Sequence, residues 1–142
     1  MFAAFPLLAL PVLLYNLVAL TFPGGFKSAE ASPRLTDPLF SIAMPSHGQW
    51  PVTLGDVLLA ASLVVLFVEL LKSTTSRSVA IINHSLSMVL FIGCLVEFLL
   101  LPACATSAFF LIMVMVLLDV LAGFIMTIVA ARRDVDYHTD RA

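Results

Sequence analysis

The stretch that decides the fold is ATSAFFLIMVMVLLDVLAGFIMTIVAA, residues 105–131, in which Asp119 is the single charged residue. At about 1.5 Å of rise per residue, a helix of this length crosses the roughly 30 Å hydrocarbon core of a bilayer. Apolar residues occupy every face of such a helix, so no face is left for water. The stretch therefore predicts a helix that spans a membrane.

The composition of the whole chain agrees with this prediction. Of the 142 residues, 61% are hydrophobic and 11% are charged, and the mean hydropathy is +1.10. A water-soluble domain of this size needs far more charge on its surface. The formal net charge of -2 provides no basic groove, so a nucleic-acid partner is not expected. The lipid bilayer is the expected surrounding.

Three further apolar blocks are expected to form helices, over residues 2–22, 53–72 and 79–101. The first block has no basic start and no small-residue cleavage site, which favours a retained helix over a signal peptide. Pro11 lies in its middle, and because proline lacks a backbone donor we expect a kink there. Residues 1–142 thus predict one all-α domain, a bundle of four transmembrane helices.

One long and two short connections join these helices. Residues 23–52 form the long loop, in which residues 39–44 are apolar enough to lie on the membrane surface. Trp50 is placed for the aromatic belt at the membrane interface. The loop is compatible with a short strand or an interfacial helix. The short connections predict that the last three helices pack as sequential antiparallel neighbours.

The basic residues predict the orientation, because positively charged loops stay in the cytoplasm. Five of the seven basic residues lie beside the turn between the second and third helices or in the tail, residues 132–142: Lys72, Arg77, Arg132, Arg133 and Arg141. This distribution predicts a bacterial inner-membrane protein with both termini in the cytoplasm. The long loop then lies outside.

Four acids lie within the expected helices: Asp56, Glu69, Glu97 and Asp119. A carboxylate inside a bilayer costs several kcal/mol unless it is protonated, paired or hydrated. Asp56 has a structural explanation, because Thr53 and Asp56 have the spacing of a helix-capping box. The other three acids need protein, protons or trapped water around them.

Antiparallel packing of the second and third helices predicts two polar layers. Glu69 would lie level with His84, and Asp56 level with Glu97. The layers cannot both face the same contact, since side chains turn by about 100° per residue. For Glu69 and His84 the alternatives are a polar clasp that fixes helix register and a proton-handling pair, because histidine titrates near neutrality.

The third expected helix has one mostly polar face: Asn83, Ser87, Cys94 and Glu97, with His84 beside it. In a membrane such a face contacts protein or water. This helix is therefore expected at the centre of the bundle or along a hydrated path. Cys94 and Cys104 lack the spacing of a metal or redox motif and are interpreted as packing residues.

Asp119 is the acid hardest to explain by structure alone, because it lies near the middle of its helix. Gly123 and Thr127 follow at four-residue intervals and form a face that another helix can approach closely. A protonated Asp119 that bonds across this contact, to Tyr15 or Asn16, is the structural alternative. Ion or proton handling is the functional alternative.

These features predict two functions. The first is an accessory or scaffold protein that packs against itself, as a homo-oligomer, or against a larger membrane complex that supplies donors to the acids. The second is a proton- or cation-handling component of a transporter or channel that uses Asp119, Glu97, Glu69, His84 and Asn83. A third class, a quinone or lipid bound in a groove beside His84 and Glu69, has no motif. No catalytic, metal or cofactor motif occurs in the sequence, so neither enzyme activity nor a cofactor is expected.

Four segments also carry a resemblance: FVELLKSTTSR (67–77), NHSLS (83–87), LLDVLAGF (117–124) and ARRD (131–134). In these segments the chain resembles small four-helix inner-membrane proteins of proteobacteria that are themselves uncharacterised. The resemblance covers roughly residues 50–135. It implies a bacterial inner-membrane location and no particular chemistry.

Overall fold

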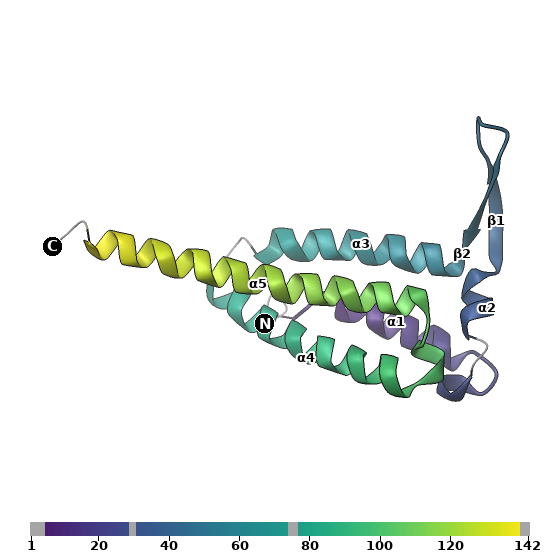
Figure 1. Ribbon diagram of the computed structural model, residues 1–142, viewed down its shortest axis with the longest axis horizontal. Helices are drawn as coiled ribbons and strands as arrows, with labels where there is room; N and C mark the ends of the chain where they lie inside the picture. The colour runs from purple at the N-terminus through teal and green to yellow at the C-terminus, as the bar shows by residue number, and fades with distance from the viewer. Residues whose placement is uncertain (1–4, 29–30, 74–76, 140–142) are drawn as a thin grey trace.

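The computed structural model describes residues 5–28, 31–73 and 77–139 (Figure 1). It is 74% helical, so the predicted all-α class is confirmed. By length and composition, three helices are able to cross a membrane. They are α3 (Leu54–Ser73), α4 (Arg77–Leu100) and α5 (Ser107–Thr139).

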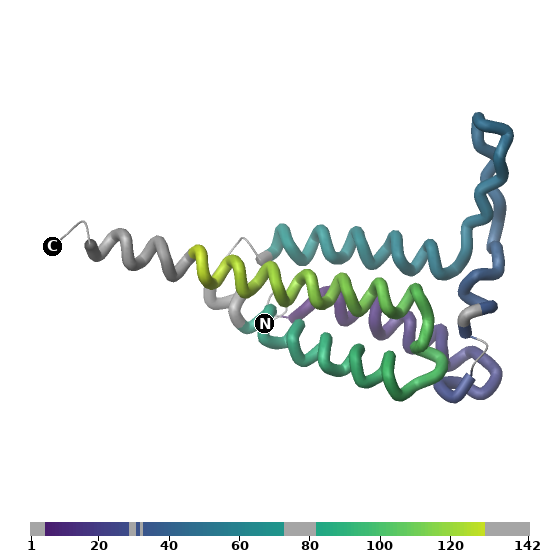
Figure 2. Tube along the Cα trace, viewed as in Figure 1, coloured from purple at the N-terminus to yellow at the C-terminus, as the bar shows by residue number. Residues whose placement is uncertain are grey.

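Helix α5 lies between α3 and α4, which contact each other little (Figures 1 and 2). Of the three candidate spans, the one in α5 has the highest mean hydropathy, 2.7, and the largest buried share, 44% against 22% for α4. The expectation that α4 is the central helix is therefore wrong, and α3 and α4, which were expected to pack along each other, make few contacts. A helix that is apolar on all sides can bury two faces at once, whereas α4 has one polar face to bury.

The first helix, α1 (Ala9–Leu20), has 12 residues and is too short to cross a bilayer unaided. A bend and a turn occupy residues 5–8, and residues 2–4 of the expected span lie outside the described part of the chain. Pro11 consequently falls in the first turn of α1, where helical N–H groups have no partner within the helix. The expected kink is therefore not needed. The membrane span expected over residues 2–22 is not found as one helix.

The long connection is folded into short elements. They are η2 (Gly25–Lys27), α2 (Ala31–Thr36) and the antiparallel strands β1 (Pro38–Ala43) and β2 (Gln49–Thr53). The two strands form a hairpin that stands across the helix axes at one end of the bundle (Figure 1). His47 has a φ of 62° in its turn. The long loop thus contains strands, one of the two structures that its sequence allowed.

Tyr15 fastens α1 to the turn between α4 and α5. Its hydroxyl is 2.9 Å from the carbonyl of Ala103 and 2.6 Å from Oγ1 of Thr106, and its ring lies 4.8 Å, between centroids, from that of Phe109. Ala103 belongs to the short helix η3 (Pro102–Cys104). The buried phenol hydroxyl thus has partners, as a buried polar group requires.

Both cysteines are buried free thiols, which agrees with their interpretation as packing residues. Cys104 ends η3 and Cys94 lies in α4. Both belong to the hydrophobic core, which also takes in Phe109, Ile112 and Val116 of α5.

Candidate functional site

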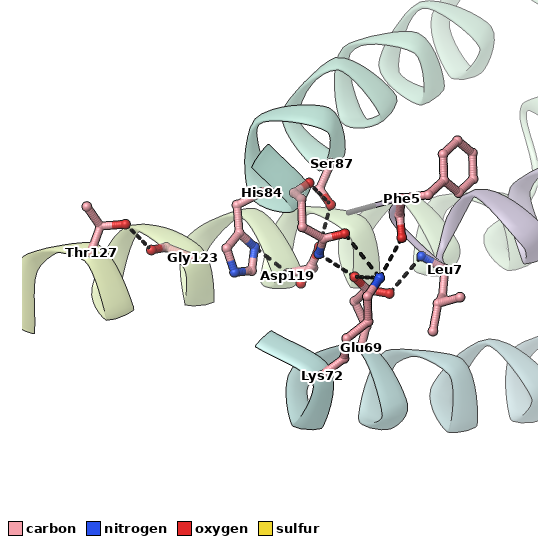
Figure 3. A network of polar contacts seen from close by, with 10 residues as sticks. Phe5, Leu7, Glu69, Lys72, His84, Ser87, Asp119, Gly123 and Thr127 are labelled. Atoms are coloured by element: carbon pink, nitrogen blue, oxygen red, sulfur yellow. Dashed lines mark hydrogen bonds and ion pairs between the residues drawn. The ribbon is translucent and has the colours of Figure 1, made fainter. Parts of the chain in front are cut away.

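Polar side chains from three helices meet inside the bundle. We call this group the central cluster: Glu69, Lys72, Asn83, His84, Ser87 and Asp119 (Figure 3). Helix α3 supplies the first two residues, α4 the next three and α5 the last. The cluster brings together four of the five residues that the sequence singled out for ion handling, all but Glu97.

Glu69 is fully buried, yet its carboxylate is well supplied with donors. Oε2 accepts a 2.7 Å hydrogen bond from the backbone N–H of Leu7, and Oε1 accepts one from the side-chain amide of Asn83. The ammonium group of Lys72 lies 3.5 Å from Oε1 and donates to the carbonyl of Phe5 at 2.6 Å. Glu69 thus has a polar partner on α4, as expected, but that partner is Asn83 and not the predicted His84.

His84 does not face Glu69, although it lies next to Asn83 in sequence. A step of one residue turns a helical side chain by about 100°, which directs His84 toward α5 instead of α3. There its Nδ1 lies 3.5 Å from Oδ1 of Asp119. The predicted pair of Glu69 and His84 is therefore wrong, because the depth argument ignored the helix that lies between α3 and α4.

Asp119 is fully buried and meets α4, not α1. Its Oδ2 accepts a hydrogen bond of 2.5 Å from the hydroxyl of Ser87. The expected partners on α1 are engaged elsewhere: Tyr15 with Ala103 and Thr106, and Asn16 with Glu97 at 3.0 Å. Asp119 therefore does hydrogen-bond across a helix contact, as the structural alternative expected, but its partner is Ser87, and the suggested partners Tyr15 and Asn16 are wrong.

Three buried polar atoms of the central cluster have no hydrogen-bond partner among the described residues. They are Nδ1 and Nε2 of His84 and Oδ1 of Asp119. A buried donor or acceptor without a partner costs about 1–3 kcal/mol. A proton held between the carboxylate and the imidazole would satisfy two of these atoms.

The close approach of α4 to α5 depends on Gly123. A methyl group built on Gly123 would overlap the imidazole of His84, so only glycine leaves room for the ring. The prediction that Gly123 admits another helix is confirmed. Thr127, by contrast, donates to the carbonyl of Gly123 at 2.9 Å, within its own helix.

An open groove of about 230 Å³ adjoins the imidazole of His84 between α4 and α5. Its polar lining consists of His84, Ser85 and Thr127, and its apolar lining includes the exposed side chains of Met88 and Phe124. This space was not evident from the sequence, which gives no distance between helices.

The second predicted polar layer divides into two separate groups. Thr53 and Asp56 form the expected capping box: Asp56 accepts from the N–H and hydroxyl of Thr53 at 2.9 and 2.8 Å and returns its own N–H at 3.1 Å. Glu97, which is half-buried, pairs instead with Asn16 of α1. Asp56 and Glu97 were predicted to lie level in one polar layer. The structure gives no contact between them, and each carboxylate has a different partner.

The polar face predicted on α4 is confirmed as a protein contact. Asn83, Ser87 and Cys94 are all buried. Among the described residues, no group of three or more His, Cys, Asp or Glu side chains is arranged to hold a metal ion. The chemistry that this arrangement offers is the exchange of protons between a carboxyl, a hydroxyl and an imidazole.

The helical fold and its three long apolar helices are those of a membrane-embedded protein. No family model, no curated protein and no solved structure matches the chain. What the protein does must therefore be argued from the central cluster itself.

Proposed function

We propose that this protein is a small bacterial inner-membrane subunit that takes up and releases a proton at the pair Asp119 and His84. The observation that carries the proposal is that a fully buried carboxylate oxygen faces an imidazole nitrogen at 3.5 Å, while neither has a hydrogen-bond partner among the described residues. A proton near both atoms is the smallest species that meets this need. An imidazole is suited to the task because each of its ring nitrogens can either carry a proton or accept a hydrogen bond.

Ser87 allows the site to exist in two protonation states. Its hydroxyl has one proton and two acceptors within reach, Oδ2 of Asp119 at 2.5 Å and the carbonyl of Asn83 at 3.1 Å. When Asp119 is ionised, Ser87 donates to the carboxylate. When Asp119 is protonated on Oδ2, the acid donates to Ser87, and the hydroxyl turns to the carbonyl of Asn83. Neither state leaves Oδ2 without a bond.

A polar route joins this pair to one end of the bundle. Lys72, whose side chain is 20% exposed, contacts Glu69 and Asn83, and Ser87 reaches the carbonyl of Asn83 as well as Asp119. We assign this end to the cytoplasmic side, because Lys72 and Arg77 flank the short segment of sequence between α3 and α4. Protons would thus reach Asp119 from the cytoplasm.

An apolar interval separates the central cluster from Glu97 and Asn16. Residues 88–96 of α4 include no Asp, Glu, Lys, Arg or His, and they extend over about 14 Å at about 1.5 Å per residue. One chain therefore offers no continuous polar route across the bilayer. This interval favours the second proposal, an accessory protein in a homo-oligomer or a larger membrane complex, in which a neighbour completes the route.

Infrared spectroscopy of the protein in lipid tests the proton site. The carboxyl stretch of a protonated acid is expected to grow and fade as the pH is cycled, and Asp119→Asn should abolish that change. Glu97→Gln is the matched control, because it removes a membrane carboxyl outside the central cluster and should leave the signal in place. A signal that persists in Asp119→Asn would contradict the assignment.

Proton flux into vesicles separates the two proposals. Wild type and Asp119→Asn would be reconstituted densely enough for copies to associate. A flux that is lost in Asp119→Asn, while the protein remains folded, supports a proton-handling component. Absence of flux in every preparation, together with a stable complex that Asp119→Leu disrupts, supports the accessory role instead.

A further inference from the structure

The hairpin of β1 and β2 has one apolar face. The register pairs Phe40 with Val52 and Ile42 with Trp50, and directly opposed residues of an antiparallel pair project on the same side. The opposite side of the same ladder has the pairs of Ser41 with Pro51 and of Ala43 with Gln49. The large apolar side chains of the paired ladder are therefore gathered on one face.

This face is largely uncovered. Phe40, Ile42 and Trp50 are 54%, 41% and 50% exposed, and residues 38–55 contain no Asp, Glu, Lys or Arg. The sheet has only two strands, and an isolated hairpin of that size is marginally stable in water. Something outside the described part of the chain must cover the face if the hairpin is to stay ordered.

The position of the hairpin points to lipid. Its strands run across the helix axes at the end of the bundle where α3 begins (Figures 1 and 2). The other end of α3 carries Lys72 and the central cluster. If the helices cross the membrane, the strands lie parallel to its surface, at the level where the apolar side of α3 first meets the bilayer.

Val52 connects the apolar face to α3. It directly precedes Thr53, which caps α3, and its side chain is 7% exposed. Phe40, Ile42 and Trp50 share its side of the hairpin. The apolar face is therefore continuous with a buried side chain at the start of α3.

We propose that this face rests on the phospholipid bilayer at the extracytoplasmic surface, with Phe40, Ile42 and Trp50 in the zone between headgroups and acyl chains. Aromatic side chains prefer that zone, and the lack of charge removes the cost of entering it. The lipid-facing surface of α3 continues directly into the face, because β2 leads into α3 without a linker. The inference requires a membrane protein and is independent of proton handling.

The chain offers a direct probe, since Trp50 is its only tryptophan. The full-length protein would be reconstituted at low density in phosphatidylcholine vesicles that contain lipids brominated either near the headgroup or near the end of the acyl chain. The fluorescence emission of Trp50 should be blue-shifted. Bromine near the headgroup should quench it more than bromine near the end of the acyl chain, and iodide in the water should quench it little. Strong quenching by iodide with none by bromolipid would overturn the proposal. So would blue-shifted emission that neither quencher affects, since it would indicate a protein partner.

A pair of double variants tests the face itself. Phe40→Thr with Ile42→Thr places β-branched residues in the strand but removes two large apolar side chains from the face, and it should reduce shallow bromolipid quenching at least twofold. Ser41→Thr with Ala43→Thr changes the opposite face and should leave the quenching as in wild type. Circular dichroism checks that both variants keep their helices. Equal quenching in the two variants would refute the assignment of the face.

Discussion

The imidazole of His84 occupies the space that a side chain on Gly123 would fill, so α4 and α5 meet at a ring placed against a bare backbone. The same ring directs its Nδ1 toward Oδ1 of Asp119. Packing and the candidate proton site thus depend on one contact. A change at Gly123 should affect both, whereas Asp119→Asn, which keeps an oxygen that can accept from Ser87, should affect mainly the second.

Gly123→Ala should destabilise the protein, because the added methyl group overlaps the ring of His84. Overpacking of this kind costs about 1–3 kcal/mol. Gly93→Ala on α4 is the matched control, since no atom lies within 4 Å of a methyl group placed there. Unfolding of both variants at increasing concentrations of a denaturing detergent measures the loss of stability. Equal stability of the two variants would contradict the contact.

Glu69→Gln should be costly, because both carboxylate oxygens accept hydrogen bonds and an amide nitrogen cannot. One donor of the clasp would be left without an acceptor, at about 1–3 kcal/mol. Glu97→Gln should be nearly neutral by comparison, since the amide oxygen of glutamine can still accept from Asn16. Reversible unfolding in lipid or mild detergent compares them. A larger loss of stability in Glu97→Gln than in Glu69→Gln would contradict the importance of the clasp at Glu69.

Tyr15→Phe should loosen α1, because it removes the hydroxyl that contacts Ala103 and Thr106. Thr106 keeps its bond from the N–H of Phe109, but the buried carbonyl of Ala103 loses this donor, at a cost of about 1–3 kcal/mol. Thr21→Val serves as the control, since the hydroxyl of Thr21 bonds the carbonyl of Val18 at an exposed position. Limited proteolysis of the segment after α1 reports the loosening. Cleavage at the wild-type rate in Tyr15→Phe would count against the anchor.

Cys104 should resist alkylation in the folded protein. Burial raises the pKa of its thiol from an ordinary 9.0 to about 11, and the thiol has no exposed surface. Because the folded pKa lies above the unfolded one, the stability that the neutral thiol contributes is intact below pH 9 and is lost as the pH rises toward 11. Maleimide labelling of Cys94→Ala, which leaves one thiol, should be slow at pH 7–8 until detergent unfolds the chain. Rapid labelling of the folded protein would disprove this.

Local spacing predicted the features that depend on neighbours in the sequence. The capping box of Thr53 and Asp56, the polar face of α4 and the small-residue contact at Gly123 all follow from helical periodicity. The hairpin also left a signal, because Phe40 and Ile42 alternate with small residues in the period of a strand. The short length of α1 did not follow, because hydropathy alone cannot locate where a helix begins.

The order of the helices could not be obtained in the same way. Residues of α3 and α4 at equal depth in the membrane were expected to face each other, which paired Glu69 with His84. In the structure α5 lies between most of α3 and α4, and His84 contacts α5. Nothing in one sequence fixes which apolar helix lies between the other two. The partner of Asp119 was missed for the same reason, although Ser87 was already placed on the polar face.

Nuclear magnetic resonance of the protein in lipid tests most directly the claim that the pair of Asp119 and His84 takes up and releases a proton. Aspartate labelled at its carboxyl carbon and histidine labelled at its ring nitrogens would be followed as the pH is varied over the range in which the protein stays folded. The signals of Asp119 and His84, assigned through Asp119→Asn and His84→Gln, should change together over one transition. Signals that stay constant throughout, or that change independently of each other, would contradict the claim.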